Sequence, residues 1–254
     1  MGNHRSDVWE GTDVDVLKLI QARQSTRGPF DPGRRISHED MTKILEAARW
    51  APTAHNMQNF DIMVVDDPGE LQVIAALRSS ANETFVRENY KQLSFSEEEL
   101  RRKKVGLLGT MFPAWMRDPN AKQDANGPAS FQSGLIPSSA GFLIVTYDPA
   151  RRAPASEGDF LGVVSLGCVM ENMWLMANSL GIAFQVVSVV SSEPAAAQVK
   201  ELLEIPKDLK IAFAARLGYA AHPSNYLRVR RDVEDFAHGN AFTDRWSPRS
   251  PAEM

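Results

Sequence analysis

Two clusters of arginine have the composition of an anion-binding site. The first is Arg23-Gln24-Ser25-Thr26-Arg27, and the second comprises Arg228, Arg230 and Arg231 near the end of the 254-residue chain. Arginine binds phosphate through paired hydrogen bonds, and a serine hydroxyl can add another. The first cluster also ends a predicted helix, where the helix dipole favours cations without any ligand. Spacing alone therefore leaves two interpretations, a phosphate site and a solvated basic helix end.

A second candidate segment joins a predicted helix to a predicted strand. It reads Ala51-Pro52-Thr53-Ala54-His55-Asn56-Met57-Gln58-Asn59-Phe60. Its residues are mostly small and able to form hydrogen bonds, so the backbone can approach a flat ring closely and bond to its polar edge. The alternative is an ordinary turn between helix and strand.

Familiar catalytic motifs are absent from the sequence. It contains no glycine-rich phosphate loop, no His-Glu-x-x-His pair and no Gly-x-Ser-x-Gly elbow. The five histidines are scattered without metal-ligand spacing. We therefore expect no metal and no catalytic side chain, and predict that a cofactor carries the chemistry of any enzyme here.

Composition excludes some partners. The net charge of −4 gives no general attraction to nucleic acid or to an anionic membrane. No run of 18 apolar residues is present, so we predict no membrane-spanning segment. The single cysteine, Cys168, cannot form an internal disulfide and suits a reducing compartment such as the cytoplasm.

Hydrophobic periodicity and turn residues predict the elements that position these segments. Predicted helices cover about 13–24, 38–51, 69–79 and 158–180, and others start at Ser96 and after Ser192. Predicted strands cover 60–65, 141–147, 184–190 and 209–217. Because the strands are short and widely separated among more numerous helices, we expect one α+β domain over residues 1–254, with a central sheet covered by helices.

In order and spacing, the chain resembles the nitroreductase family of FMN flavoproteins over residues 17–231. Arg23–Arg27 is similar to the family's Arg-x-Ser-x-Arg/Lys, and Ala51–Phe60 to Ala-Pro-Ser-x-x-Asn-x-Gln-Pro-Trp. The stretch Cys168–Gly181 is similar to a central helix that reads near Gln-Asn-Leu-Leu-Leu-Ala-Ala before Leu-Gly. The fourth match is Leu217-Gly218-Tyr219, with Arg228-Val229-Arg230 downstream.

The resemblance implies a fold, a cofactor and a partner. The fold would be a mixed central sheet flanked by helices, in an intertwined homodimer. The tail at about 219–254 would wrap around the partner subunit, and FMN would bind at the interface, two per dimer, with each site lined by both chains.

The resemblance also assigns cofactor-binding residues. Arg23, Arg228 and Arg230 would hold the phosphate, with Ser25 and Gln24 at the phosphate and ribityl end. Arg27 would lie near the pyrimidine edge, where a cation stabilises the negative charge of reduced FMN. The loop of the other chain would contribute Pro52, Thr53, Ala54 and Asn56, and the central helix would contribute Ser165. The strand after that helix would contribute Val187, Ser188 and Val189, with a backbone N–H of Ser188 or Val189 pointing at N5 of the flavin.

Departures and an insertion affect the substrate side. Asn59 and Phe60 replace the family's Pro and Trp, and the position of Ser188 is often Gly or Glu. The insertion at about 85–133 would act as a lid over the flavin. Its Phe112, Trp115 and Met116 would sandwich an aromatic acceptor against the flavin or, alternatively, pack as a satellite core.

The function implied is electron transfer from NADH or NADPH to a small aromatic acceptor, a nitro compound or a quinone, in a ping-pong order. Three alternatives stay open at this point: a flavin-dependent dehydrogenase, a reductive dehalogenase of the same family, and a non-catalytic flavin-binding protein.

Overall fold

The structure, a computed structural model, describes residues 15–77, 96–104, 134–156, 158–222 and 228–246. The chain divides into two compact units. The first contains residues 1–79 and 132–223, and the second contains residues 80–131 and 224–254. The second unit thus combines most of the predicted insertion with most of the predicted tail, and the single domain stays a prediction.

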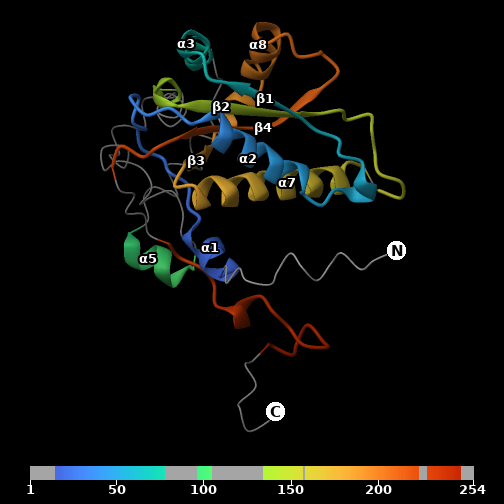
Figure 1. Ribbon diagram of the computed structural model, residues 1–254. Coiled ribbons are helices and arrows are strands. Elements are labelled where there is room, and N and C mark those ends of the chain that lie inside the picture. Colours follow the sequence, from blue (N-terminus) through green and yellow to red (C-terminus); the bar gives the residue numbers. More distant parts are fainter. Residues whose placement is uncertain (1–14, 78–95, 105–133, 157, 223–227, 247–254) are drawn as a thin grey trace, which may run out of the picture. The chain divides into compact units, whose positions relative to one another are not determined.

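A four-stranded sheet forms the centre of the first unit (Figure 1). Its strands are β1 (Asp61–Val65), β2 (Gly141–Tyr147), β3 (Ala183–Val186) and β4 (Lys210–Gly218), in the order β1-β2-β4-β3. All three strand pairs are antiparallel. A mixed sheet also needs parallel pairing. Among the described residues, parallel pairing occurs at one isolated bridge, between Ser25 and Phe184.

Two helices pack side by side on one face of this sheet, α2 (His38–Arg49) and α7 (Phe160–Ser179) (Figure 1). Their apolar residues and alternate residues of β2 and β4 form the main core: Ile44, Ala48, Leu143, Val145, Leu166, Val169, Met173, Ala177, Phe213, Ala215 and Leu217. Asn172 of α7 also donates a 3.1 Å hydrogen bond to the Ala47 carbonyl of α2. Helix–helix contact is therefore both apolar and polar.

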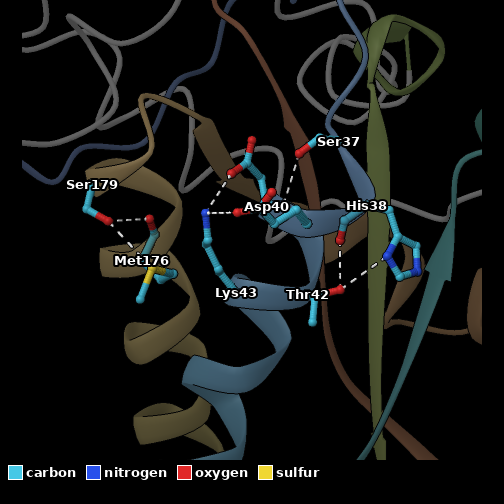
Figure 2. A network of polar contacts seen from close by, with 8 residues as sticks. Ser37, His38, Asp40, Thr42, Lys43, Met176 and Ser179 are labelled. Carbon is cyan, nitrogen blue, oxygen red and sulfur yellow. Dashed lines mark hydrogen bonds and ion pairs between the residues drawn. The ribbon is translucent and has the colours of Figure 1, made fainter.

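The start of α2 follows from its sequence. The Ser37 hydroxyl accepts a 3.0 Å hydrogen bond from the Asp40 N–H and caps the helix (Figure 2). One turn later Lys43 forms ion pairs with Glu39 and Asp40 at 2.8 and 3.6 Å. These acidic residues lie in the first turn, where the helix dipole favours negative charge.

The other side of the sheet is also covered. Phe142, Ile144 and Ala214 alternate along β2 and β4 with the core residues and are fully buried. Figure 1 shows α3 (Pro68–Ala76) and α8 (Ala195–Leu202) on this side. Their buried residues are Leu71, Ile74, Ala195, Ala196 and Val199. Both faces of the two central strands are therefore shielded from water.

One predicted strand is shorter than expected. β3 ends at Val186, and Ser188–Val190 form a 3-10 turn, η6, instead of continuing the strand to Val190. The Val187 N–H still donates to the Ala214 carbonyl of β4 at 2.8 Å, but the Ser188 carbonyl then accepts from the backbone and hydroxyl of Ser191. These local hydrogen bonds replace pairing with β4, so the prediction of a strand through 190 is wrong.

Helices α1 and α7 of the first unit each expose several apolar side chains. Phe160 and Val163 of α7 are 68% and 56% exposed, and α1 (Val16–Ala22) exposes Val16, Leu17 and Ile20. By length and mean hydropathy α7 would suffice to cross a membrane, and only 28% of that stretch is buried. Glycine, serine and Glu171 interrupt the helix, so it contains no unbroken apolar run. A core helix with an uncovered apolar face has the same composition.

Arg216 is a fully buried cation in β4. Its guanidinium donates hydrogen bonds to the Gln185 side chain, at 2.7 Å, and to the carbonyls of Leu135 and Gly28. The same group lies 3.8 Å from the ring centroid of Phe30. Arg216 therefore ties the segment before α2 to the sheet: it satisfies the buried Gln185 side chain and two partly buried carbonyls.

We expect Arg216→Met to lower the free energy of unfolding of the protein by about 3 kcal/mol, because it leaves the buried Gln185 side chain and two partly buried carbonyls without this donor. Urea denaturation followed by circular dichroism measures this change. Arg152→Met, at an exposed arginine, is the control and should change it by less than about 0.5 kcal/mol. Equal stability of the two variants would contradict a structural role for Arg216.

The second unit contains α5 (Glu97–Arg102) and the 3-10 turn η7 (Val233–Asp235). The capping box predicted at Ser96 and Glu99 is confirmed. Lys104, just after α5, forms ion pairs with Asp232, at 2.8 Å, and with Asp235. The hydrogen bond from Lys104 lowers the pKa of Asp235 below its ordinary value of 3.8, and those from Lys104 to Asp232 and Asp235 raise the pKa of Lys104. One lysine thus joins the insertion to the tail.

These shifts fix a pH dependence. A lowered pKa for Asp235 means that its stabilising effect is present above the ordinary carboxyl range and is lost as the pH falls through the lowered pKa. We expect the protection of the α5 and η7 amides against hydrogen exchange, corrected for intrinsic rates, to fall below about pH 4. Asp235→Asn should reduce it already at neutral pH, whereas Glu234→Gln, at an exposed neighbour, should not. Protection independent of pH and of Asp235→Asn would contradict this.

Candidate cofactor site

The first arginine of the anion cluster follows directly after α1. The Arg23 N–H donates to the Leu19 carbonyl at 3.1 Å, which ends the helix. Its side chain is 20% exposed, and its Nε lies 3.3 Å from a carboxylate oxygen of Glu171 on α7. Its guanidinium carbon lies 4.4 Å from the ring centroid of Trp174, one turn further along the same helix. Arg23 is thus held by two side chains of α7.

Trp174 also holds the residues that follow Arg23. Its indole N–H donates to the Gln24 carbonyl at 3.2 Å, and its ring stacks on Phe184 of β3 with 5.1 Å between centroids. The Phe184 carbonyl in turn accepts a 3.2 Å hydrogen bond from the Thr26 N–H. The cluster therefore runs along the edge of β3 in a fixed register.

The end of the cluster is fixed by the fourth matched segment. Phe30 packs on Gly218, where an added Cβ would lie 2.6 Å from its ring, so the glycine in Leu217-Gly218-Tyr219 makes room for it. The Tyr219 carbonyl accepts a 2.8 Å hydrogen bond from the Asp31 N–H. The segment at 28–31 thus packs against the end of β4, almost 190 residues later in the chain. The hydrogen bond from Arg216 to the Gly28 carbonyl also joins these two segments.

The loop at 51–60 has an unusual backbone. His55, Asn56 and Gln58 have φ values of 51°, 51° and 46°, a left-handed conformation that costs a non-glycine residue about 1 kcal/mol or more. The Thr53 carbonyl accepts from the Asn56 N–H at 2.9 Å, and the Thr53 hydroxyl accepts from the Gln58 N–H at 3.2 Å. Such strain is found at functional sites when the surroundings hold it in place.

Two side chains anchor this loop. Ser165 of α7 accepts a 2.9 Å hydrogen bond from the Ala54 N–H and donates to the Leu161 carbonyl at 2.7 Å. The Asn59 amide donates to the carbonyls of Asp148 and Arg151 at 2.8 and 3.0 Å. Its oxygen accepts from the Asp148 N–H at 3.1 Å. Asn59, in place of the family's proline, thereby fastens the loop to the end of β2. The role of Ser165 toward a flavin ring stays a prediction.

A small cavity lies between this loop and α7, lined by Thr53, Met57, Tyr147 and Ser165 among others. The Tyr147 hydroxyl donates to an Asp159 carboxylate oxygen at 3.1 Å. Burial, together with this hydrogen bond, raises the pKa of Tyr147 above its usual value. Tyr147 therefore remains a protonated donor at neutral pH and lines the cavity beside the loop at 51–60.

The two halves of the candidate site contact different parts of α7. Ser165 touches the loop and Trp174 touches the arginine cluster, nine residues further on. A helix rises 1.5 Å per residue, which places the two contacts about 14 Å apart along its axis. Within one chain, the cluster and the loop are therefore offset from each other along α7.

The other predicted residues are placed as follows. Arg27 is partly buried, Pro52 and Asn56 are exposed, and Ser188 is exposed in η6 while Val187 is buried. Arg228 and Arg230 belong to the second unit, so their approach to Arg23 stays a prediction. Phe112, Trp115 and Met116 lie outside the described residues. The described part of the chain brings together no group of three or more metal-binding side chains.

Sequence reasoning overlooked the side chains that hold the cluster in place. Glu171 and Trp174 belong to the stretch that resembles the family's central helix, and both contact Arg23. Glu171 is also the single charged residue among the twenty of α7. A charge in an apolar helix next to an arginine motif is the signal that would have identified it.

The donor set fits a ligand with two chemical parts. The guanidinium of Arg23 and the hydroxyl of Ser25, two residues further on, match the acceptor oxygens of a phosphate, and Arg27 adds a second cation for a polar ring edge. The strained loop of small residues offers backbone to a flat, polar ring. This chemistry suits a phosphate-bearing cofactor with an aromatic ring system such as FMN.

Comparison with known proteins agrees with this assignment. The family model described as the nitroreductase family matches residues 20–219. Protein DrgA of Synechocystis sp. is 26% identical over 210 residues, which are 81% of this chain and 84% of that protein. An NADPH-dependent oxidoreductase of Staphylococcus haemolyticus is 23% identical over 89% of this chain and 74% of that protein.

A solved nitroreductase with bound FMN from Bacteroides fragilis shares the fold. Its TM-score is 0.55 at 18% identity, over 89% of this chain and 99% of that one. The family model extends from the residues before the arginine cluster to Tyr219, and so includes both halves of the candidate site. The chain therefore belongs to the nitroreductase family.

Proposed function

We propose that this nitroreductase-family enzyme binds FMN and transfers electrons from NADH or NADPH to a small aromatic acceptor, a nitro compound or a quinone. The observation that carries the proposal is the arginine cluster held along β3 by Trp174 and Arg216. Donor and acceptor bind in turn, in a ping-pong order. The lone Cys168 favours the cytoplasm, where reduced nicotinamides supply the electrons.

The residues of the chain hold and orient the cofactor. Arg23 and Ser25 bind the phosphate, with Arg228 and Arg230 completing this end. Arg27 lies at the pyrimidine edge, where its charge favours the reduced state. Bound FMN supplies a two-electron carrier that the side chains of the protein lack. No protein acid or base is needed, because water can supply protons.

A second copy of the chain completes each site. The loop at 51–60 and the arginine cluster are offset by about 14 Å along α7, so each would face a different FMN in a two-fold dimer. The exposed apolar residues of α1 and α7 give the partner a surface to cover. The tail at 219–254 wraps around that partner.

Flavin binding and reduction test the function. The purified protein should be yellow, gain thermal stability with FMN, and have its flavin reduced anaerobically by NADH or NADPH faster than free FMN. Arg23→Ala should weaken FMN binding by roughly tenfold to a hundredfold, because charge-assisted hydrogen bonds to phosphate are lost. Fluorescence titration measures this.

Arg35→Ala is the matched control, because Arg35 is an exposed arginine that donates to the Asp66 carbonyl away from the cluster. It should leave FMN affinity unchanged. A colourless protein that FMN does not stabilise would contradict the proposal, and tight FMN with no accelerated reduction would favour a non-catalytic flavin-binding protein instead.

Dimerisation has its own test. Val163→Glu places a charge on the exposed face of α7 and should halve the mass measured by light scattering. FMN affinity should fall with it, because each site loses its second chain. Val73→Glu, at a similarly exposed valine of α3, is the control and should leave both unchanged. A monomeric wild-type protein with full FMN affinity would overturn the shared site.

A further inference from the structure

Arg23 contacts two side chains that would affect its binding of a phosphate in different ways. Trp174 presents the face of its ring to the guanidinium at 4.4 Å, and Glu171 places a carboxylate 3.3 Å from Nε. The ring orders the arginine without changing its net charge. The carboxylate offsets that charge and competes with any anion that approaches.

We propose that Glu171 is a built-in competitor for the phosphate of the cofactor: it occupies Arg23 in the free protein and weakens phosphate capture, while Trp174 positions the arginine. The proposal rests on the proposed function, because it assumes that Arg23 meets the FMN phosphate.

Geometry allows this exchange of partners. Glu171 is 42% exposed, so its side chain can turn into water when an anion replaces it. Arg23 cannot move as freely, because its side chain is 20% exposed and lies on a tryptophan that is itself stacked on Phe184. The backbone after Arg23 is also held, because the Gln24 carbonyl bonds to Trp174 and the Thr26 N–H bonds to the Phe184 carbonyl. The mobile partner is therefore the carboxylate and the fixed partner is the arginine.

The placement of the two side chains points to the same role. Glu171 and Trp174 lie one helical turn apart, on one face of α7, and both reach the same guanidinium. Arg23 thus has an aromatic support together with a counter-charge.

Replacing the Glu171 carboxylate with an amide of the same shape tests the effect of its negative charge alone. Glu171→Gln keeps the shape and the hydrogen-bond acceptor but removes the repulsion, and we expect FMN to bind roughly fivefold more tightly. Riboflavin, which lacks the phosphate, should bind with unchanged affinity. The gain for FMN should shrink as salt is raised. Glu201→Gln on α8 is the matched control and should change neither affinity.

Variants of Trp174 test the positioning role. Trp174→Leu removes the ring but keeps an apolar side chain, and it should weaken FMN binding roughly tenfold, with a smaller effect on riboflavin, because the guanidinium loses its support. Trp174→Phe retains a ring and should stay within about threefold of the wild type. Thermal unfolding of each ligand-free variant shows whether the fold is intact.

Each outcome decides a different point. FMN affinity that is unchanged or lower in Glu171→Gln overturns the competitor role, and so does an equal gain for FMN and riboflavin. If the wild type binds neither flavin, the proposed function fails while the inference is still tested with inorganic phosphate. Phosphate should then raise the melting temperature of Glu171→Gln more than that of the wild type, and an equal rise in both overturns the inference.

Discussion

The candidate site depends on the packing of α7 against the central sheet. Leu166, Val169, Met173 and Ala177 bury one face of this helix on β2 and β4, and that contact sets the height and rotation of every other residue on it. Ser165 and Trp174 belong to the same rigid element, so the loop at 51–60 and the arginine cluster are positioned by one apolar interface. A change in that interface would displace both halves of the site together.

Polar side chains fix the backbone of the segments that line the candidate site. The buried guanidinium of Arg216 holds Gly28, the indole of Trp174 holds Gln24, and the amide of Asn59 holds the end of β2. Each of these hydrogen bonds goes to a backbone carbonyl. The cost of burying or ordering such groups is offset when their hydrogen bonds are satisfied. The loop can consequently retain left-handed residues that would be unstable in an isolated peptide.

The apolar character of α7 calls for a cover over its exposed part. The helix is apolar nearly all round, and the sheet and α2 cover part of it, but Phe160 and Val163 stay exposed. A membrane would cover these residues, and so would a second subunit. The family relation, the offset of the two half-sites and the neighbouring apolar residues of α1 favour the subunit. The same surface that keeps the helix out of water would then bring two chains to one cofactor.

Several features could be predicted from the sequence because they depend on local chemistry. The capped starts at Ser37 and Ser96, the glycine end of α7 and the strands β1, β2 and β4 follow from nearby residues, and so does the arginine motif. The early end of β3 could not be predicted, because β-branched residues favour a strand until competing turn bonds form around Ser188. The partners of Arg23 and Arg216 were equally out of reach. The partners of Arg23 lie about 150 residues away, and those of Arg216 lie 31 to 188 residues away, so only the folded sheet and α7 bring them within bonding distance.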